Sequence, residues 1–473
     1  MKKYITNSAK LLLAIGMLVP AMAALSQETP KQDSKAEDEK FTYGTPAFFR
    51  PYSQNGIGVF ETSKADFSKP YEGKKIRFGA GFTMQFQGIK HENAPTTLGN
   101  TNKLWKLTPG FMTAQANLFI DVQLADGVSM NVTNYMSARH HNEFWVKGGY
   151  FQLDKLPFIK SDVLDNIMKY ATIKVGHMEI NYGDAHFRRP DGGATLQSPF
   201  MEGNIMDAFA TEIGGEVYFQ KNGMIAMVGL TNGMIKGHVD STFKTAQDDN
   251  TKRNPSIYGK LGIDKSLGDQ LRFRLTGSIY TNSSQAGSGI TLYSGDRTGS
   301  NYQNVMEVEK KFDAATNSYI TKSYTDMYSS GRFNPGFSKK ITAIMVNAFM
   351  KAYGFEFFGT YENAKGRSKT ETAERKANQF AVEGLYRFGK SENFYIGARY
   401  NKVNAELMQT ATTTPALADV SIDRTAFAAG WFLTKNVLMK AEYVTQNYNG
   451  FLGNDFRNGG KFKGYVIEAI VGF

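Results

Sequence analysis

The sequence predicts an all-β protein, a transmembrane antiparallel β-barrel of about 16 strands. Many segments alternate apolar and polar residues, as strands with two different faces do. After the N-terminus no apolar run approaches the ~20 residues that a spanning helix needs, although the chain has 35 Phe, 24 Tyr and 47 Gly. The last ten residues alternate in the same way and end on an aromatic residue, so a closing strand is predicted at 464–473.

The N-terminus has the features of a secretory signal peptide, predicted over 1–26. Three lysines precede an apolar stretch at 11–25, which contains small-residue cleavage sites. Residues 27–74 are predicted to form a periplasmic N-terminal tail and arm. The polar start of this segment predicts a flexible tail, and the aromatic, turn-rich stretch 48–61 predicts a short arm that docks under or inside the barrel.

The barrel itself is predicted to span 75–473. In its first strand Phe78 and Phe82 face outward and Arg77 faces inward, because side chains alternate along a strand. A short helix at 161–169, capped by Ser161 or Asp162, is expected on the periplasmic side. The sixteen predicted strands all follow from the same alternation: 75–88, 111–124, 128–137, 144–153, 172–180, 212–219, 224–231, 256–264, 271–280, 341–350, 355–362, 379–388, 394–404, 422–433, 437–447 and 464–473.

The connections between these strands sort into two kinds. Most short turns fall on the side that a periplasmic N-terminus makes periplasmic, and most long polar segments fall on the other side. The long segments include a loop at 181–210, predicted to fold into the barrel, and a large outer loop at 281–340 with its own hairpin around 319–327. A soluble β-sandwich or propeller is the alternative, and it predicts an apolar core without this sorting.

Two stretches resemble bacterial outer-membrane proteins. The closing strand, with Tyr465, Val471 and Phe473 on one face, resembles the assembly signal of outer-membrane barrels. The leader 48–61 resembles that of Gram-negative outer-membrane porins distantly similar to phosphate- and polyphosphate-selective porins. The resemblance implies passive diffusion of small hydrophilic solutes or ions. Its partners would be outer-membrane lipid and lipopolysaccharide, the barrel assembly machinery and, as a homotrimer, further copies of the chain.

Strand parity predicts the charged lining of an aqueous pore. The basic and acidic side chains balance, so facing rows of opposite charge predict only a mild ion preference. The alternative is that these groups are paired or solvated wall charges. The predicted pore-lining residues are Arg77, Lys174, Lys260, Arg272, Arg274, Arg387, Arg399, Arg424, Lys440, Asp121, Glu212, Glu216, Asp264, Glu356, Glu362, Glu383, Glu442 and Glu468.

The predicted constriction lies early in the loop at 181–210, because the corresponding loop narrows the lumen in the porins that this chain resembles. Arg188 and Arg189 are the candidates for binding carboxylate or phosphate solutes, since guanidinium groups bind oxyanions bidentately. Asp184 and Asp191 flank them and are candidates to neutralise them, and His186 lies between. The alternative is an outer loop with solvated charges. This stretch lacks the lysines of the phosphate-selective porins, so phosphate specificity is not expected.

Other functions find little support. The six histidines form no catalytic constellation with serine or aspartate, and the adjacent His140 and His141 project to opposite sides of an extended chain. No enzyme activity, metal or cofactor is expected. The net charge of +11 is spread along the chain, so no nucleic-acid partner is expected. The alternatives to a porin are a plugged barrel subunit of a larger outer-membrane complex and, more weakly, a barrel enzyme.

Overall fold

The computed structural model describes the chain from residue 40 to residue 473. The residues left out within this range are 63, 65–66, 68, 95–101, 113, 138–143, 191, 234–239, 241–243, 269, 286–288, 296–299, 314–315, 323–330, 411–414 and 454. The predicted signal peptide and most of the predicted tail therefore lie outside the described residues, as do Asp191, His140 and His141. Residues Phe41–Phe473 form one compact unit.

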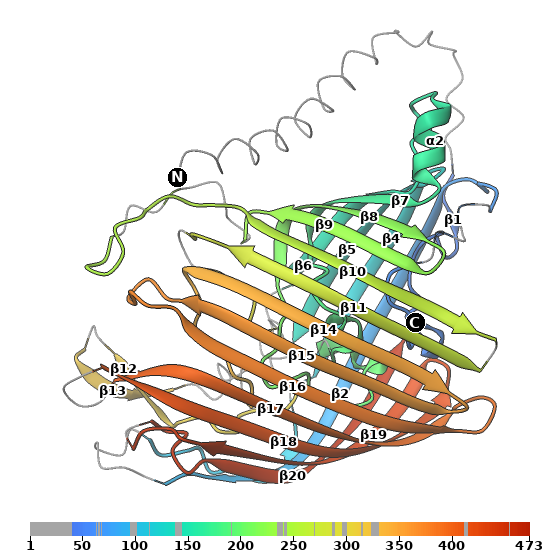
Figure 1. The fold of residues 1–473 in the computed structure, drawn as a ribbon. Helices are drawn as coiled ribbons and strands as arrows, with labels where there is room; N and C mark the ends of the chain where they lie inside the picture. Colours follow the sequence, from blue (N-terminus) through green and yellow to red (C-terminus); the bar gives the residue numbers. More distant parts are fainter. Residues whose placement is uncertain are drawn as a thin grey trace. The chain divides into compact units, whose positions relative to one another are not determined.

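Sixteen long antiparallel strands form a closed barrel (Figure 1). β20 pairs with β2 from Gly472 opposite Gly81 to Lys461 opposite Glu92, so the wall has no free edge. The prediction of about sixteen strands is confirmed. The wall strands are β2 (Lys75–Glu92), β4 (Gln115–Ala125), β5 (Val128–Ser137), β6 (Trp145–Leu153), β7 (Ala171–Glu179), β8 (Thr211–Lys221), β9 (Met224–Thr231), β10 (Ser256–Leu267), β11 (Leu271–Asn282), β14 (Lys340–Ala352), β15 (Phe355–Arg367), β16 (Arg375–Phe388), β17 (Phe394–Thr410), β18 (Pro415–Thr434), β19 (Val437–Asn449) and β20 (Lys461–Gly472).

The other elements are short. The helix α2 (Asp162–Met168) begins as predicted, with the Ser161 side chain accepting a hydrogen bond from the backbone N–H of Leu164 at 3.4 Å. Among the described residues no helix has the length and apolarity to cross a membrane. The remaining short elements are β1 (Thr42–Tyr43) and β3 (Gly110–Phe111), which pair with β2, the hairpin of β12 (Lys310–Asp313) and β13 (Ser318–Thr321), and the 3-10 turns η1 (Gln54–Gly56), η3 (Ala185–Arg188) and η4 (Gly192–Gln197).

Turn chemistry explains one of the tight hairpins. β8 and β9 are joined through Asn222 and Gly223, whose φ angles are +52° and +78°. Two successive positive φ angles define the type I′ turn, which matches the twist of paired strands and favours Asn-Gly. The sequence therefore determines this connection locally.

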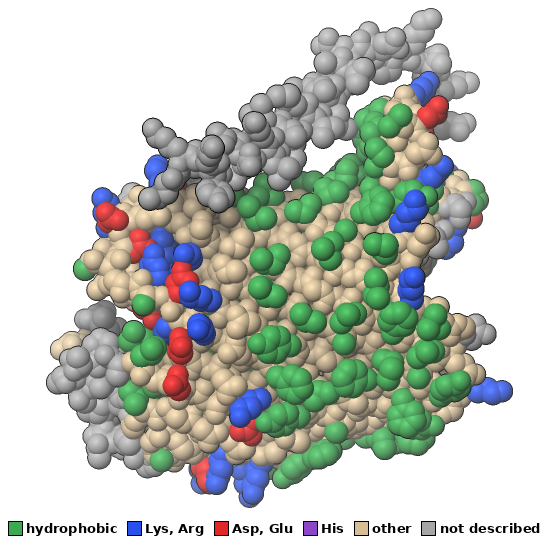
Figure 2. All heavy atoms as spheres, in the orientation of Figure 1, with side chains coloured by type: hydrophobic (Ala, Val, Ile, Leu, Met, Phe, Trp, Pro, Cys, Tyr) green, Lys and Arg blue, Asp and Glu red, His purple; other side chains and the backbone are tan. Residues whose placement is uncertain are grey.

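The two faces of the wall differ in the way that a membrane barrel requires. Hydrophobic side chains cover the outer face of the strands in Figure 2, and charged side chains gather near the end where the β12–β13 hairpin lies. Phe427 and Trp431 are 58% and 57% exposed, whereas Arg424 on the same strand is 1% exposed. An apolar exterior around a polar interior contradicts the soluble β-sandwich or propeller alternative.

Candidate pore and its constriction

Three segments enter the barrel, beginning with the N-terminal arm. The Tyr52 ring stacks on Phe119 of β4 at 4.1 Å, and its hydroxyl donates to Asp121 Oδ2 at 2.8 Å. Gln54 reaches the opposite wall, where its amide donates to the carbonyl of Ser391 in the β16–β17 turn at 3.0 Å. The arm therefore crosses the end of the barrel at which the β16–β17 turn lies.

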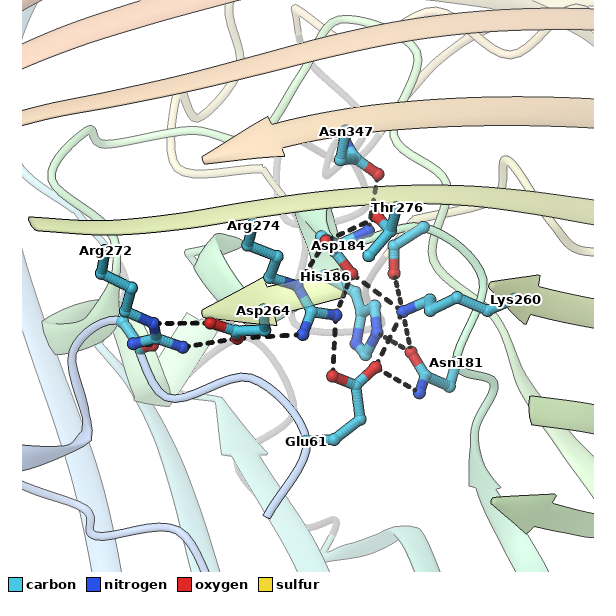
Figure 3. A network of polar contacts seen from close by, with 12 residues as sticks. Glu61, Asn181, Asp184, His186, Lys260, Asp264, Arg272, Arg274, Thr276 and Asn347 are labelled. Atoms are coloured by element: carbon cyan, nitrogen blue, oxygen red, sulfur yellow. Dashed lines mark hydrogen bonds and ion pairs between the residues drawn. The ribbon is translucent and has the colours of Figure 1, made fainter. Parts of the chain in front are cut away.

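A charged network fastens both the arm and the loop 180–210 to the wall (Figure 3). Glu61 of the arm pairs with Lys260 of β10 at 3.2 Å and with Arg274 of β11 at 2.7 Å. Asp184 of the loop shares both cations, at 3.0 and 2.8 Å, and accepts from Thr276 Oγ1 at 2.7 Å. Burial by itself raises the pKa of Glu61, but Lys260 and Arg274 outweigh it and hold this pKa at about 2.

The loop carries the predicted constriction residues. Arg188 donates to Glu356 of β15 at 2.7 Å and to Glu383 of β16 at 3.0 Å. Arg189 instead pairs with Asp207 of the same loop at 2.7 Å. Asp184, which the sequence offered as a neutralising neighbour of the arginines, is bound to Lys260 and Arg274, so strand glutamates and Asp207 neutralise the arginines.

His186 occupies a position beside this network. Its Nε2 lies 2.9 Å from Asn181 Oδ1, and its Nδ1 lies 3.6 Å from Glu179. Its ring packs on Phe187, with centroids 3.9 Å apart. The structure therefore brings Asp184, His186, Arg188 and Arg189 together inside the barrel.

The predicted lining residues all belong to the inner face, but most contact other protein groups. Arg77 pairs with Asp121, Arg272 with Asp264 at 2.7 Å, and Lys440 with Glu468 at 2.7 Å. Arg387 pairs with Glu356 at 2.9 Å. Others hold the loop: Glu442 accepts from Met201 N at 2.9 Å, and Arg399 donates to the carbonyl of Glu202.

Described residues of the segment between β11 and β14 form a third insertion. Asn301 N donates to Glu202 at 2.7 Å, Arg332 pairs with Glu202 at 3.0 Å, and Tyr302 donates its hydroxyl to Glu442. Burial raises the pKa of Glu202, but Arg332 and Arg424 outweigh it and lower this pKa below its ordinary value. Part of the predicted outer loop therefore folds inward and covers the loop 180–210.

Sequence reasoning missed the partners that these inserted segments supply. Tyr52, Glu202, Tyr302 and Arg332 lie outside the alternating strands, so parity gives no direction for them. The only sequence feature that could have marked these residues as contact residues is their type. Each is a charged or hydroxyl-bearing residue in a segment otherwise rich in Gly, Ser and Asn. Such a composition indicates a loop, but not the wall residue that the loop contacts.

A cavity of about 270 Å³ remains on the other side of the lumen. Its wall comes from β4 to β8, and the arm and the loop form its opposite side. Strand residues that line it are Phe119, Asn131, Thr133, Tyr150, Lys174, Met178, Glu179, Glu216 and Tyr218. Lys174 and Glu216 are the predicted lining residues that border this cavity, and the Lys174 ammonium lies 4.9 Å from the Tyr150 ring centroid and 5.2 Å from that of Tyr218. Two further cavities, of about 510 and 670 Å³, are bordered by Arg272 together with Arg274 or Arg387.

Comparisons with known proteins give distant structural likenesses. No family model and no curated protein matches the chain. Similar solved structures include an anion-selective porin from Comamonas acidovorans, with 10% identity, a TM-score of 0.48, and coverage of 85% of this chain and 100% of that one. The outer membrane channel DcaP of Acinetobacter baumannii has 10% identity and a TM-score of 0.47, covering 86% and 99%. OmpT, an outer membrane protein of Vibrio cholerae, has 10% identity and a TM-score of 0.46, covering 86% and 99%.

The fold rests on the strand pairing of this chain. A closed, even-numbered antiparallel barrel with an apolar outer face is the architecture of bacterial outer-membrane proteins. The transmembrane antiparallel barrel expected from the sequence is therefore confirmed as an architecture. The protein is a sixteen-stranded β-barrel of the bacterial outer membrane.

Proposed function

We propose that this protein is a non-enzymatic porin through which small hydrophilic solutes or ions diffuse passively. The observation that carries the proposal is the asymmetry of the lumen. Most bonds of the loop 180–210 run to strands β10, β11 and β14 to β19, with single bonds to β2 and β8, while a cavity bordered by charged, polar and aromatic groups remains between the loop, the arm and β4 to β8. Barrels of this strand number have room for an aqueous channel.

The constriction in this proposal consists of the loop residues Asp184, His186, Arg188 and Arg189, with Asp191 outside the described residues. The ion pairs of Arg188 and Asp184 fix the loop in position, because each spans from the loop to the wall. Solutes then pass between the loop and the β4–β8 wall. We also propose that the protein contacts lipopolysaccharide, is inserted by the barrel assembly machinery and forms a homotrimer.

A second candidate is a barrel subunit with a plugged lumen in a larger outer-membrane complex. It is favoured by the three stacked insertions, in which Tyr52, Glu61, Glu202 and Tyr302 bind wall or loop groups. In such a subunit the cavity would be closed at both ends. The outer loop and the arm would be its partner surfaces.

Liposome swelling separates the two candidates. Purified protein is reconstituted into liposomes, which are then diluted into isotonic glycine, arabinose, glucose or sucrose. A porin gives swelling rates that fall steeply with solute size, because the opening beside the loop is narrow. Folded protein that gives no swelling with any of these solutes contradicts the porin proposal and supports the plugged subunit.

A further inference from the structure

The cavity along β4 to β8 contains an unusual arrangement of charge. Lys174 projects from β7 between the rings of Tyr150 and Tyr218. Within the described part of the chain, its ammonium has neither a hydrogen bond nor an ion pair to a carboxylate. Cation–π contacts leave the positive charge in place, so this ammonium is available to an anion.

Two of the three carboxylates that border the same cavity, Glu216 and Glu61, are held by several partners each. Glu216, directly across the strand pair from Lys174, accepts hydrogen bonds from the hydroxyls of Tyr218 and Tyr258 and from Asn181 N. Glu61 is held by two cations in the network of Figure 3. Glu179 lies 3.6 Å from the Nδ1 of His186.

A second cation borders the cavity from the arm. Arg50 donates from Nε to the Gly56 carbonyl at 2.9 Å and from Nη1 to the Phe187 carbonyl at 3.0 Å, and neither partner carries charge. Burial, followed by repulsion from Arg188, lowers the pKa of Arg50 to about 9, although the Glu179 carboxylate opposes the shift in part. A bound anion would relieve this destabilisation of the charged guanidinium.

The rest of the lining mixes polar and aromatic residues. Asn131, Thr133 and Gln197 are among the polar ones, and the aromatic ones include the stacked Tyr52 and Phe119 together with Phe49, Phe187 and Tyr150. Such rings pack against a flat or aliphatic body but offer few donors to a small, strongly hydrated ion. The cavity volume of about 270 Å³ suits a small organic molecule.

We propose that this cavity is a binding site for small organic carboxylates, with Lys174 and Arg50 binding the carboxylate and the aromatic rings packing against the body of the solute. The site rests on the proposed porin function and names the solute class that the pore favours. Solutes of this class would be concentrated at the narrowest part of the pathway. Their passage would then exceed that of neutral molecules of the same size.

Isothermal titration calorimetry on the detergent-solubilised full-length protein tests the site, because it measures binding without relying on transport. The probes are sodium benzoate, neutral benzamide and inorganic phosphate. The variants are Lys174→Gln, the charge-conserving Lys174→Arg, and Lys376→Gln, which removes the same charge from an exposed position on β16. Heat-modifiable gel mobility verifies that each variant is folded.

Benzoate is expected to bind the native protein and the Lys376→Gln variant equally. Affinity should fall roughly 10- to 100-fold in Lys174→Gln, the range for losing a hydrogen bond to a charged group, and should be largely kept in Lys174→Arg. Equal benzoate affinity in Lys174→Gln and native protein overturns the site, as does phosphate or benzamide binding as tightly as benzoate. Benzoate binding without solute flux would support the carboxylate site and contradict the porin function. Solute flux without benzoate binding would support the porin function and contradict the carboxylate site.

Discussion

Replacing Arg188 with methionine is expected to release the loop 180–210 from the wall. Arg188 is 6% exposed. Among the described residues it is the ion-pair partner of Glu383. Glu356 would still pair with Arg387 after Arg188 is replaced. Removing one partner of a buried ion pair costs about 3–5 kcal/mol, because it leaves a buried charge uncompensated. If that cost falls on the attached state of the loop, the displaced state gains a factor on the order of 10² to 10³.

Single-channel recording measures this change. The Arg188→Met channel is expected to fluctuate and to show steps of larger conductance than the native channel. Arg457→Met serves as the control, since Arg457 pairs with Asp455 two residues away in an outer loop. The double variant Arg188→Met with Glu383→Met should recover steady steps, because it removes both partners of the pair. Unchanged steps in the folded single variant would refute the assignment of Arg188 as a fastener of the loop.

Further predictions concern charge, pH and assembly. The double reversal Arg188→Glu with Arg189→Glu should shift the reversal potential toward cations, and an unchanged potential would remove the loop from the ion pathway. The pKa of Glu61 is about 2, below its ordinary value of 4.5, so its stabilisation of the docked arm is complete above pH 4.5 and is lost as the pH falls toward 2. The chain has no cysteine, so a fluorophore can be attached to a Ser53→Cys variant at neutral pH. Its quenching by a soluble quencher should increase over that pH range, while the added Glu61→Gln substitution makes the quenching insensitive to pH there. Deleting Phe473 should reduce the outer-membrane level of the protein, and a normal level on membrane fractionation would contradict its role with Tyr465 and Val471 in assembly.

Strand parity predicted the wall because its information is local. Each strand residue has only two directions, and the apolar outer face fixes the choice, so Arg77 and Glu468 could be assigned inward from sequence. The same alternation placed Tyr465, Val471 and Phe473 outward, where they are 43%, 39% and 59% exposed. The closing pair of β20 with β2 then followed from the even number of strands.

The insertion of the arm and of the loop was expected, but the wall residues that they contact escaped prediction because loops have no such periodicity. Most of the hairpin expected around 319–327 lies outside the described residues. A hairpin is formed by β12 and β13, and Asn317 with a φ of +47° stands just before β13. Asn tolerates this left-handed conformation, so the turn signal was present. Nothing in the local sequence indicated that Asp184 would bind Lys260 and Arg274, since these pairs join residues at least 76 positions apart.

The balance of charges also changes meaning in the folded chain. Sequence parity gave equal numbers of acids and bases facing inward and predicted a mild ion preference. In the structure arginine and lysine side chains form ion pairs with Glu356, Glu383 and Asp184. Tyrosine hydroxyls donate hydrogen bonds to Glu216. Lys174, which has no ion pair among the described residues, borders the cavity along β4 to β8. Which charged groups are paired is therefore a better guide to ion selectivity than how many of each sign face inward.

The central claim, that an aqueous path runs beside the inserted loop, is tested most directly by planar-bilayer conductance of the purified protein under a salt gradient. Steady open steps are expected, with a reversal potential that favours anions because Lys174 and Arg50 border the cavity. Electrical silence from folded, heat-modifiable protein would contradict the claim and leave a plugged barrel.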